Sequence, residues 1–348
     1  MKMTKDGKYG VGVFGIGWVA GEHIKAYLNN PQCEIVALAS RRRESAESKK
    51  AELNLDCDIL DTYDDLIKRD DIDIISMCSP NFLRAEEIVK ACEAGKHFFA
   101  EKPVAHNLDE LKTIKAAYEK ARKKHGIKTI CGFSILYYNQ FLCIESMIKK
   151  GALGDIFLVE TDYWHELGPW WHGWTWGCYT KKGGPSTSLL GGVHSVSALL
   201  KIGGDVDEIY AVETCGHRKE YEYAPTYTSV VKFKNGAIGK TGGSFEIESP
   251  YYFNIIVHGS KGSILNDKFF TKEVFAGQEG YQDFNCTLMN SGEVSHHPFS
   301  AIVDAFVEDI ENNTDSKLRL DFTIKVHEVC MAIDTSAATG KVVKLPLL

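Results

Sequence analysis

Apolar and polar residues follow different patterns in the two parts of the chain. In residues 1–131, short apolar runs rich in β-branched and aromatic residues alternate with segments of helical period. The runs expected to form strands are Tyr9–Phe14, Glu34–Ala39, Ile72–Cys78, His97–Ala100 and Thr129–Cys131. Two helical segments, Leu83–Ala94 and Leu108–His125, are each followed by a glycine that can end a helix. This alternation predicts an α/β domain with a doubly wound parallel sheet.

From residue 132 onward, strand patterns follow one another with few helices between them. The expected strands are Asp155–Tyr163, Glu208–Glu213, Ser229–Phe233, Ile238–Glu246 and Tyr252–His258. Asn235-Gly236 is a hairpin signal, and Ser188–Lys201 and Ala301–Asn312 have helical patterns. We therefore predict an α+β domain with a mostly antiparallel sheet over residues 132–348, joined directly to the domain of residues 1–131.

Composition narrows the class of protein. The chain has 348 residues, 44% of them apolar and 25% charged, which is typical of a globular protein of about two domains. A net charge of -7 argues against a nucleic-acid partner, and no apolar run approaches the ~20 residues of a membrane span. Ten cysteines without C-x-x-C spacing favour a cytoplasmic protein without disulfides. His296 and His297 are adjacent, a spacing that does not favour a metal site, and we expect none.

The segment Gly15-Ile16-Gly17-Trp18-Val19-Ala20 has the pattern G-x-G-x-x-[GA] between an expected strand and an expected helix. In that context the first glycine permits a tight turn and the second lets the backbone approach a pyrophosphate at the helix start. We therefore expect residues 15–19 to bind a dinucleotide. The alternative is an ordinary strand–helix turn.

The residues after the second expected strand bear on which nucleotide binds. An acidic residue here would hold the ribose 2′-hydroxyl of NAD, but the chain has Ser40-Arg41-Arg42-Arg43 instead. A hydroxyl and guanidinium groups suit a 2′-phosphate, so Ser40, Arg41 and Arg42 favour NADP(H) over NAD(H). In the alternative interpretation, the arginines are a solvated surface and NAD binds.

Three further motifs make a family recognisable: Ser79-Pro80-Asn81, Ala94-Gly95-Lys96-His97 and Glu101-Lys102-Pro103. With the glycine turn, they resemble the Gfo/Idh/MocA family of sugar and inositol oxidoreductases, and the likeness covers nearly the whole chain. The resemblance implies a Rossmann domain followed by a domain whose open sheet carries the substrate site and often an oligomer interface. It also implies cofactor contacts at Ser79, Asn81, Glu101 and Lys102, and a homo-oligomer.

The resemblance implies two catalytic residues. Lys102 would lie beside the nicotinamide and the reacting hydroxyl, where a base or a cation assists loss of a hydride. His194, within Gly192-Val193-His194, would be the acid/base histidine, although a lone histidine is more often structural. Many family members carry an aspartate four residues before this histidine, where this chain has Leu190. Two further family positions differ: an acidic residue is replaced by Ser197, and an arginine by Leu136. Because His194 lacks a carboxylate to orient it, we expect Lys102 or substrate groups to carry more of the proton chemistry.

An aromatic segment lies between the two catalytic candidates in the sequence. Five of the six tryptophans, interleaved with histidine and tyrosine, fall between residues 164 and 176. Indole faces stack on sugar rings or aryl groups, and tryptophan is also common at subunit interfaces, which is the competing interpretation. The expected substrate residues are Trp164, His165, Trp174, Trp176, Tyr179 and His194.

These observations favour NAD(P)-dependent oxidation of a secondary ring hydroxyl of a sugar, a cyclitol or a glycoside, for example at C3 of a glucoside. The nicotinamide would be retained between turnovers in one form of this hypothesis. One alternative is redox-neutral glycoside cleavage, in which transient oxidation acidifies a neighbouring C–H bond. The other, motivated by Leu190, is a non-catalytic dinucleotide-binding sensor.

Overall fold

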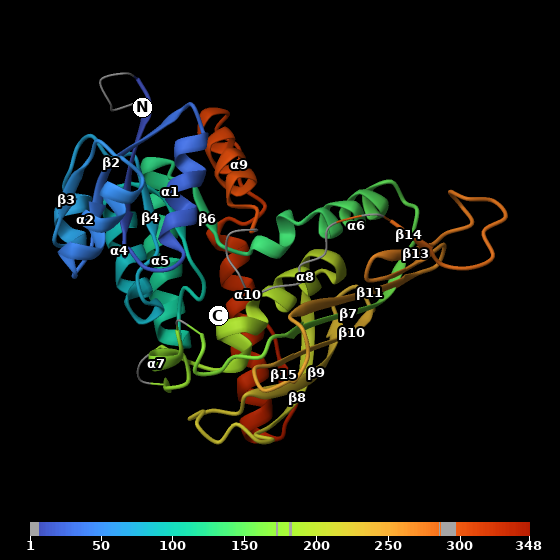
Figure 1. Ribbon diagram of the computed structural model, residues 1–348. Helices are drawn as coiled ribbons and strands as arrows, with labels where there is room; N and C mark the ends of the chain where they lie inside the picture. The colour runs from blue at the N-terminus through green and yellow to red at the C-terminus, as the bar shows by residue number, and fades with distance from the viewer. Residues whose placement is uncertain (1–6, 172, 181–182, 285, 287–296) are drawn as a thin grey trace. The chain divides into compact units, whose positions relative to one another are not determined.

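The computed structural model describes residues 7–171, 173–180, 183–284, 286 and 297–348 (Figure 1). These residues form two compact units. The first comprises the described parts of Met1–Gly132 and Val294–Ile324, and the second those of Phe133–Glu293 and Lys325–Leu348.

This division differs from the single boundary expected after residue 131, because a late segment belongs to the first unit. Helix α9 (Phe299–Glu311) packs against α1 (Ala20–Asn29), and the two lie side by side in Figure 1. Farther along, the Cys131 amide donates to the Leu318 carbonyl (N···O 3.2 Å). The apolar face of α9 is thus used to cover the first sheet, which the local helical pattern alone could not indicate.

In the first unit, six of the described strands form one parallel sheet in the order β3-β2-β1-β4-β5-β6. Their bounds are β1 Tyr9–Phe14, β2 Cys33–Ala39, β3 Asp58–Leu60, β4 Ile74–Met77, β5 His97–Ala100 and β6 Thr129–Cys131. All six residues of β1 are buried, as expected for a central strand covered on both faces. The order 3-2-1-4-5-6 is the doubly wound arrangement, so the predicted fold class is confirmed.

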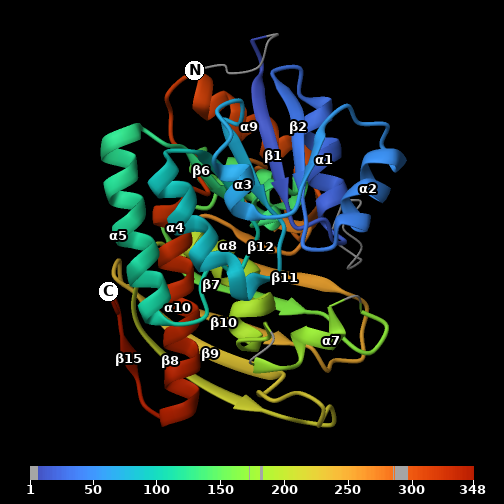
Figure 2. The same cartoon turned by 90° about the vertical axis from the view of Figure 1, so that its left-hand side faces the viewer.

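Helices connect these strands. They are α1, α2 (Arg43–Glu52), α3 (Tyr63–Ile67), α4 (Arg84–Ala94) and α5 (Leu108–His125). Gly95 and Gly126 end α4 and α5 in the left-handed conformation, as their sequence context predicts. Figure 2 shows α4 beside α5. The loops after β1, β2, β4 and β5 all leave the same carboxyl edge of the sheet, which is where such sheets bind ligands.

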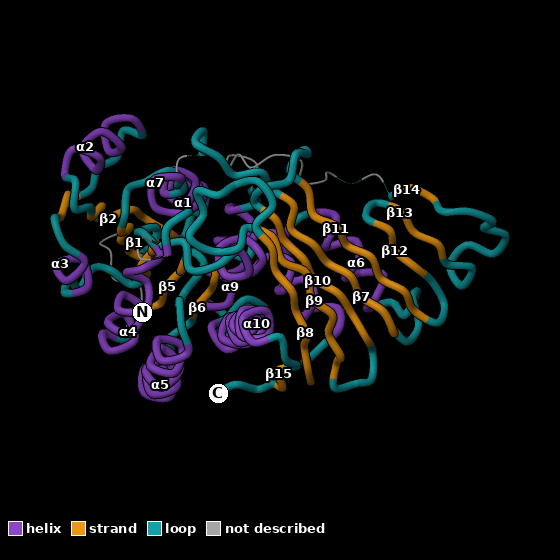
Figure 3. The backbone as a smooth tube through the Cα atoms, turned by 90° about the horizontal axis from the view of Figure 1, so that it is seen from below, coloured by secondary structure: helices purple, strands orange, loops and turns teal. Residues whose placement is uncertain are grey.

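The second unit contains a sheet of nine described strands in the order β14-β13-β12-β11-β7-β10-β9-β8-β15. Their bounds are β7 Ile156–Trp164, β8 Val206–Thr214, β9 Thr226–Phe233, β10 Ile238–Ser244, β11 Tyr252–Gly259, β12 Ser263–Leu265, β13 Lys268–Phe270, β14 Gln282–Asp283 and β15 Val343–Lys344. The pairing is antiparallel except between β7 and β10, and Figure 3 shows the central strands side by side. The predicted, mostly antiparallel sheet is therefore confirmed.

One face of this sheet is covered by α8 (Val193–Gly203), which contacts β7 and β10. Directly before α8, residues Ser188–Gly192 form a π-helical turn where the sequence predicted one continuous helix. The other helices are α6 (Asn139–Lys149), the short α7 (Trp174–Gly177) and α10 (Leu320–Thr339). No helix in the described ranges has the length and apolar character of a membrane span.

Candidate functional site

The two glycines of the nucleotide motif have different roles. Gly15 has a φ of +86°, and a Cβ built on it would lie 2.3 Å from the Ser79 backbone nitrogen. Gly15 is therefore required by the close approach of the loop after β4. A Cβ on Gly17 would meet no protein atom within 4 Å. The exposed Gly17 thus leaves space that the protein does not fill, as backbone contact with a pyrophosphate requires.

The start of α1 is suited to an anion. Its N-cap residue, Val19, supplies no side-chain hydrogen bond to the first backbone N–H groups. The first turn of a helix carries partial positive charge, and an apolar cap residue leaves those donors for a ligand. Ile16 is buried under the turn and Trp18 is 40% exposed beside it. The loop from Gly15 to Val19 therefore fits a dinucleotide pyrophosphate.

The loop after β2 separates the arginines. Arg43 donates to Glu47 (3.0 Å) and to Asp61 (3.1 Å), so its guanidinium already has carboxylate partners. Arg41 and Arg42 are exposed, and Ser40 is buried with its hydroxyl accepting the Arg42 amide at 3.3 Å. The described end of β2 has no acidic side chain at the positions of Ala39 and Ser40. The donors present here suit a phosphate better than a hydroxyl.

The loop after β4 is held by a buried ion pair that the sequence did not reveal. Arg84 Nη1 lies 3.1 Å from Glu87 Oε2, and both side chains are at most 5% exposed. The Ser79 hydroxyl donates to both Glu87 oxygens (2.5 and 2.7 Å), and Arg84 Nη2 donates to the Ser79 carbonyl at 2.6 Å. The Ser79 side chain is thus engaged in holding the loop, while Asn81 begins the following short helix and is buried.

Lys102 follows β5 at the carboxyl edge of the parallel sheet and is half-buried. Desolvation lowers its pKa, and the Glu101 carboxylate opposes that shift without cancelling it. The Lys102–Pro103 peptide bond is cis. A lysine whose pKa is lowered can release its proton nearer to neutral pH, which suits a proton acceptor.

A buried histidine that no sequence motif indicated lies next to Glu101. His23, on α1, is fully buried and its Nε2 lies 3.1 Å from Glu101 Oε1. Its Nδ1 lies 2.8 Å from the Ser76 hydroxyl on β4. The signal that could have found it is a histidine on the buried face of the helix that the glycine motif opens.

In the second unit, His194 is 5% exposed and surrounded by aromatic rings. It stacks on Tyr163 (centroids 5.9 Å apart, planes at 18°) and meets Phe253 edge-on. The Tyr163 hydroxyl bonds to His165 Nδ1 at 2.8 Å, and the His165 ring contacts that of Tyr251 at 4.4 Å. The structure therefore brings His194 and His165 into one aromatic cluster through Tyr163, a residue that the sequence did not single out.

The π turn before α8 positions His194 against the sheet. A Cβ on Gly191 would lie 2.6 Å from Tyr163 and Phe245 carbons, and one on Gly192 would lie 2.3 Å from the Tyr227 oxygen. These glycines let the turn approach the sheet closely, and such turns are frequent at functional sites. Leu190 lies inside the turn and is buried, so the i, i+4 helical spacing to His194 does not hold here. Ser197 donates to the His194 carbonyl (2.7 Å), and Leu136 is fully buried.

The predicted aromatic residues do not all share one place. Trp164 follows Tyr163 on β7 and lies on the opposite face of the sheet, near Gly242 and Asp162. It is therefore separated from His194, which the alternation of the strand explains. His165 and Trp170 contact each other at 6.1 Å between centroids, and Trp170 is 58% exposed.

The remaining aromatic residues, around α7, pack against a second loop. Trp174 meets Tyr221 edge-on at 5.5 Å, and Trp176 contacts Trp171 at 5.4 Å. Tyr179 is half-buried just after α7, whose Gly177 carbonyl accepts the Tyr223 hydroxyl at 2.7 Å. The loop after β8, which carries Tyr221 and Tyr223, is held by Glu246, whose carboxylate accepts three backbone N–H groups from residues 216–218.

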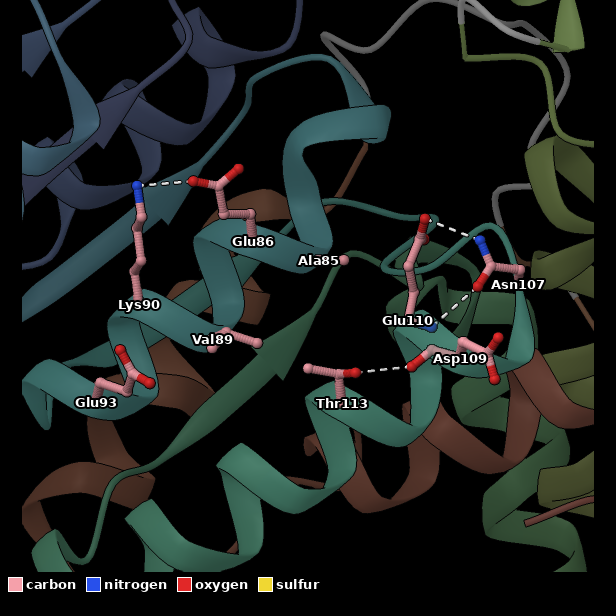
Figure 4. Close-up of a pocket in the computed structure, with 9 residues that line it drawn as sticks. All are labelled: Ala85, Glu86, Val89, Lys90, Glu93, Asn107, Asp109, Glu110 and Thr113. Atoms are coloured by element: carbon pink, nitrogen blue, oxygen red, sulfur yellow. Dashed lines mark hydrogen bonds and ion pairs between the residues drawn. The ribbon is translucent and has the colours of Figure 1, made fainter.

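A groove of about 530 Å³ lies between α4 and α5 of the first unit (Figure 4). The figure shows carboxylates, one amide and the Thr113 hydroxyl along it, with Lys90 bonded to Glu86 and Asn107 to Glu110. None of the predicted site residues lines it. Among the described residues, no group of three or more histidine, cysteine, aspartate or glutamate side chains could hold a metal ion, and His296 lies outside the described residues.

Comparison with known proteins gives a consistent result. A family model described as an oxidoreductase family with an NAD-binding Rossmann fold matches residues 9–129, and one for the Gfo/Idh/MocA C-terminal domain matches residues 141–265. D-glucoside 3-dehydrogenase of Escherichia coli (strain K12) is 23% identical over 363 residues, covering 96% of this chain and 97% of that protein. Inositol 2-dehydrogenase of Gluconacetobacter diazotrophicus is 31% identical over 152 residues, 43% of this chain and 44% of that protein.

The fold comparison agrees. The structure of a levoglucosan dehydrogenase in complex with NADH superposes with a TM-score of 0.86 at 19% identity, covering 98% of this chain and all of that one. At this identity the likeness concerns the fold. It extends over both units of the chain.

Proposed function

The chain belongs to the Gfo/Idh/MocA oxidoreductase family, and from this premise we propose that it oxidises a secondary ring hydroxyl of a sugar, glycoside or cyclitol with NAD(P). The observation that carries the proposal is Lys102, a half-buried lysine with a lowered pKa at the ligand-binding edge of the parallel sheet. Its amine takes the hydroxyl proton, which the alcohol must lose when its carbon gives up a hydride.

The first unit supplies the groups that hold the nucleotide. The backbone from Gly15 to Val19 binds the pyrophosphate, and the residues around Ser79, Asn81 and Glu101 border the nicotinamide half. The bound nicotinamide supplies the hydride acceptor. Ser40, Arg41 and Arg42 bind a 2′-phosphate in this proposal, so we favour NADP(H). Within the described part of the chain, Arg43 is the one of the three arginines that bonds to carboxylates.

The second unit supplies the carbohydrate contacts. His194 and His165 sit in an aromatic cluster whose faces suit the C–H surface of a sugar ring, and Trp174, Trp176 and Tyr179 form a second aromatic group. His194 is the second proton carrier in this proposal. Because a relative that matches 96% of the chain is named a D-glucoside 3-dehydrogenase, C3 of a glucoside is the first carbon to test.

The test is hydride transfer measured as nicotinamide absorbance, with purified protein, NAD+ or NADP+, and a panel of methyl glucosides, free hexoses and inositols. Reduction of the nucleotide by a glucoside, lost in Lys102→Ala, supports the proposal. Release of the aglycone without net reduction would assign the redox-neutral cleavage instead. Nucleotide binding with neither outcome would identify a sensor.

We also propose a cytosolic homo-oligomer. Its ten cysteines are free, which suits a reducing compartment, and apolar side chains are exposed at alternate positions of the second sheet: Tyr210, Val212, Val230 and Ile238. Light scattering of the purified protein at micromolar concentration tests this. A monomer would contradict it.

A further inference from the structure

The buried face of α1 carries a titratable group that the proposed reaction does not yet use. His23 is fully buried and packs between Phe99 of β5 (centroids 4.3 Å) and Phe299 of α9 (4.7 Å). Its two nitrogens lie within hydrogen-bond distance of Ser76 Oγ (2.8 Å) and Glu101 Oε1 (3.1 Å). A histidine placed between two apolar rings and bonded at both nitrogens has a fixed orientation.

Glu101 is held at both of its oxygens. Oε1 meets His23, and Oε2 accepts the Lys102 backbone amide at 3.3 Å. A Cβ on Gly132, after β6, would lie 2.5 Å from Oε1, so a glycine there leaves room for the carboxylate. His23 therefore fixes the carboxylate that directly precedes Lys102.

The groups around His23 favour its charged form. Burial alone disfavours the imidazolium, but the Cys78 sulfur after β4 and the Glu101 carboxylate raise the pKa of His23 to about 9. Burial likewise opposes ionisation of Glu101, yet His23, Lys102 and Arg84 together lower its pKa. Cys131 interacts electrostatically with both Lys102 and Glu101, but burial raises the pKa of its thiol, so it stays neutral. At neutral pH the histidine and the glutamate thus form an internal ion pair without net charge.

We propose that His23 is a positioning residue that neutralises Glu101 and so keeps the Lys102 amine available as the proton acceptor. Without the imidazolium, the carboxylate would stabilise the Lys102 ammonium more strongly, and less free amine would be present at neutral pH. This inference rests on the proposed role of Lys102. In addition to that role, we infer that His23 on α1 adjusts the proton affinity of Lys102 through Glu101, without contacting the substrate.

The experiment compares pH–rate profiles of kcat/KM for sugar oxidation. In His23→Gln the pair carries a net negative charge, so the acidic limb should move upward by about one pH unit and the rate at pH 7 should fall about ten-fold. In the double variant His23→Gln plus Glu101→Gln the pair is neutral again. Its acidic limb, measured at saturating nucleotide because Glu101 borders the nicotinamide half, should return to the wild-type position. His97→Gln, at the other end of β5, is the matched control and should leave the limb in place, because His97 accepts the Lys128 amide and does not bond to Glu101.

A second readout does not depend on turnover. In ¹⁵N-histidine-labelled wild-type protein, one imidazole should carry protons on both nitrogens at pH 7 and titrate near pH 9, and this signal should be missing from His23→Gln. A neutral His23 at pH 7, or an unmoved acidic limb in a folded His23→Gln protein, overturns the inference. If the wild-type protein oxidised no sugar, the proposed function would be overturned instead. The NMR result would still report the charge of His23.

Discussion

Two histidines in this chain occupy opposite environments. His23, in the first unit, bonds to a carboxylate whose other oxygen accepts the Lys102 amide. His194, in the second unit, lies among the rings of Tyr163 and Phe253, and the buried Leu190 occupies the position where many family members carry an orienting aspartate. In the first unit, coupled charges therefore adjust the proton affinity of Lys102. In the second unit, ring stacking fixes the orientation of the His194 imidazole.

Two carboxylates of the second unit, Glu246 and Asp334, anchor loops through hydrogen bonds. Glu246 accepts the backbone N–H groups of residues 216–218, and the half-buried Asp334 accepts the hydroxyls of Ser186 (2.7 Å) and Ser188 (2.6 Å) at the start of the π turn. Buried charge is costly unless it is compensated by hydrogen bonds. The same residue type thus serves proton chemistry in one unit and loop anchoring in the other.

The largest expected effect separates the two units directly. Lys102→Ala should lower kcat by about 10³-fold, because it removes a general base, while nucleotide affinity measured by fluorescence titration stays nearly unchanged. His194→Ala should lower kcat by only about ten-fold, since substrate groups can replace a second proton carrier. Equal losses in the two variants would remove the contrast.

A stability measurement probes the carboxylates of the second unit. Backbone and hydroxyl donors outweigh burial and lower the pKa of Glu246 to about 2, against 4.5 for an ordinary glutamate. Its contribution is therefore full above about pH 4.5 and is lost as the pH falls toward 2, a difference of about 3 kcal/mol.

Glu246→Gln should consequently lower the free energy of unfolding at pH 7 by about 3 kcal/mol, measured by urea denaturation. The free energy of unfolding of this variant should also decrease less than that of the wild type between pH 4.5 and 2. The exposed Glu248→Gln is the control and should change little. If Glu246→Gln instead moved the pH–rate profile and left stability intact, a chemical role would have to be assigned to this carboxylate.

Nucleotide choice gives an intermediate effect within the first unit. Arg41→Ala together with Arg42→Ala should weaken NADP(H) roughly 10- to 100-fold and NAD(H) much less, because charged hydrogen bonds to the 2′-phosphate are lost. Arg43→Ala is the control, since its guanidinium already bonds to Glu47 and Asp61. Equal losses of both nucleotides in the double variant would contradict the phosphate assignment.

The smallest expected effect lies in the aromatic cluster. Tyr163→Phe keeps the ring against His194 but removes the 2.8 Å bond to His165, which should cost about 1 kcal/mol of binding and raise KM a few-fold. The pH–rate profile should keep its shape. A displaced profile would show that Tyr163 and His165 take part in proton transfer.

The sequence predicted the first unit better than the second for a physical reason. Gly15 and Gly17 perform backbone tasks at fixed spacing within one strand–turn–helix, so short motifs reveal them. His23 meets Glu101 only because β1 and β5 lie in one sheet, and that contact spans 78 residues. The cluster around His194 depends on a π turn and on strand alternation, which placed Trp164 on the other face. Short motifs in the sequence therefore indicate neither the contact between His23 and Glu101 nor the cluster around His194.

The most direct test of the central claim uses methyl β-glucoside carrying deuterium only at C3, incubated with the wild-type protein and NADP+ or NAD+. The deuterium should appear at C4 of the reduced nicotinamide, detected by mass spectrometry, and the 3-keto glucoside should form in equal amount. Lys102→Ala should give neither product. Reduced nicotinamide without deuterium, with an oxidised glucoside, would place the oxidation at another carbon. Absence of transfer from deuterated glucosides, free sugars and cyclitols alike would contradict the account.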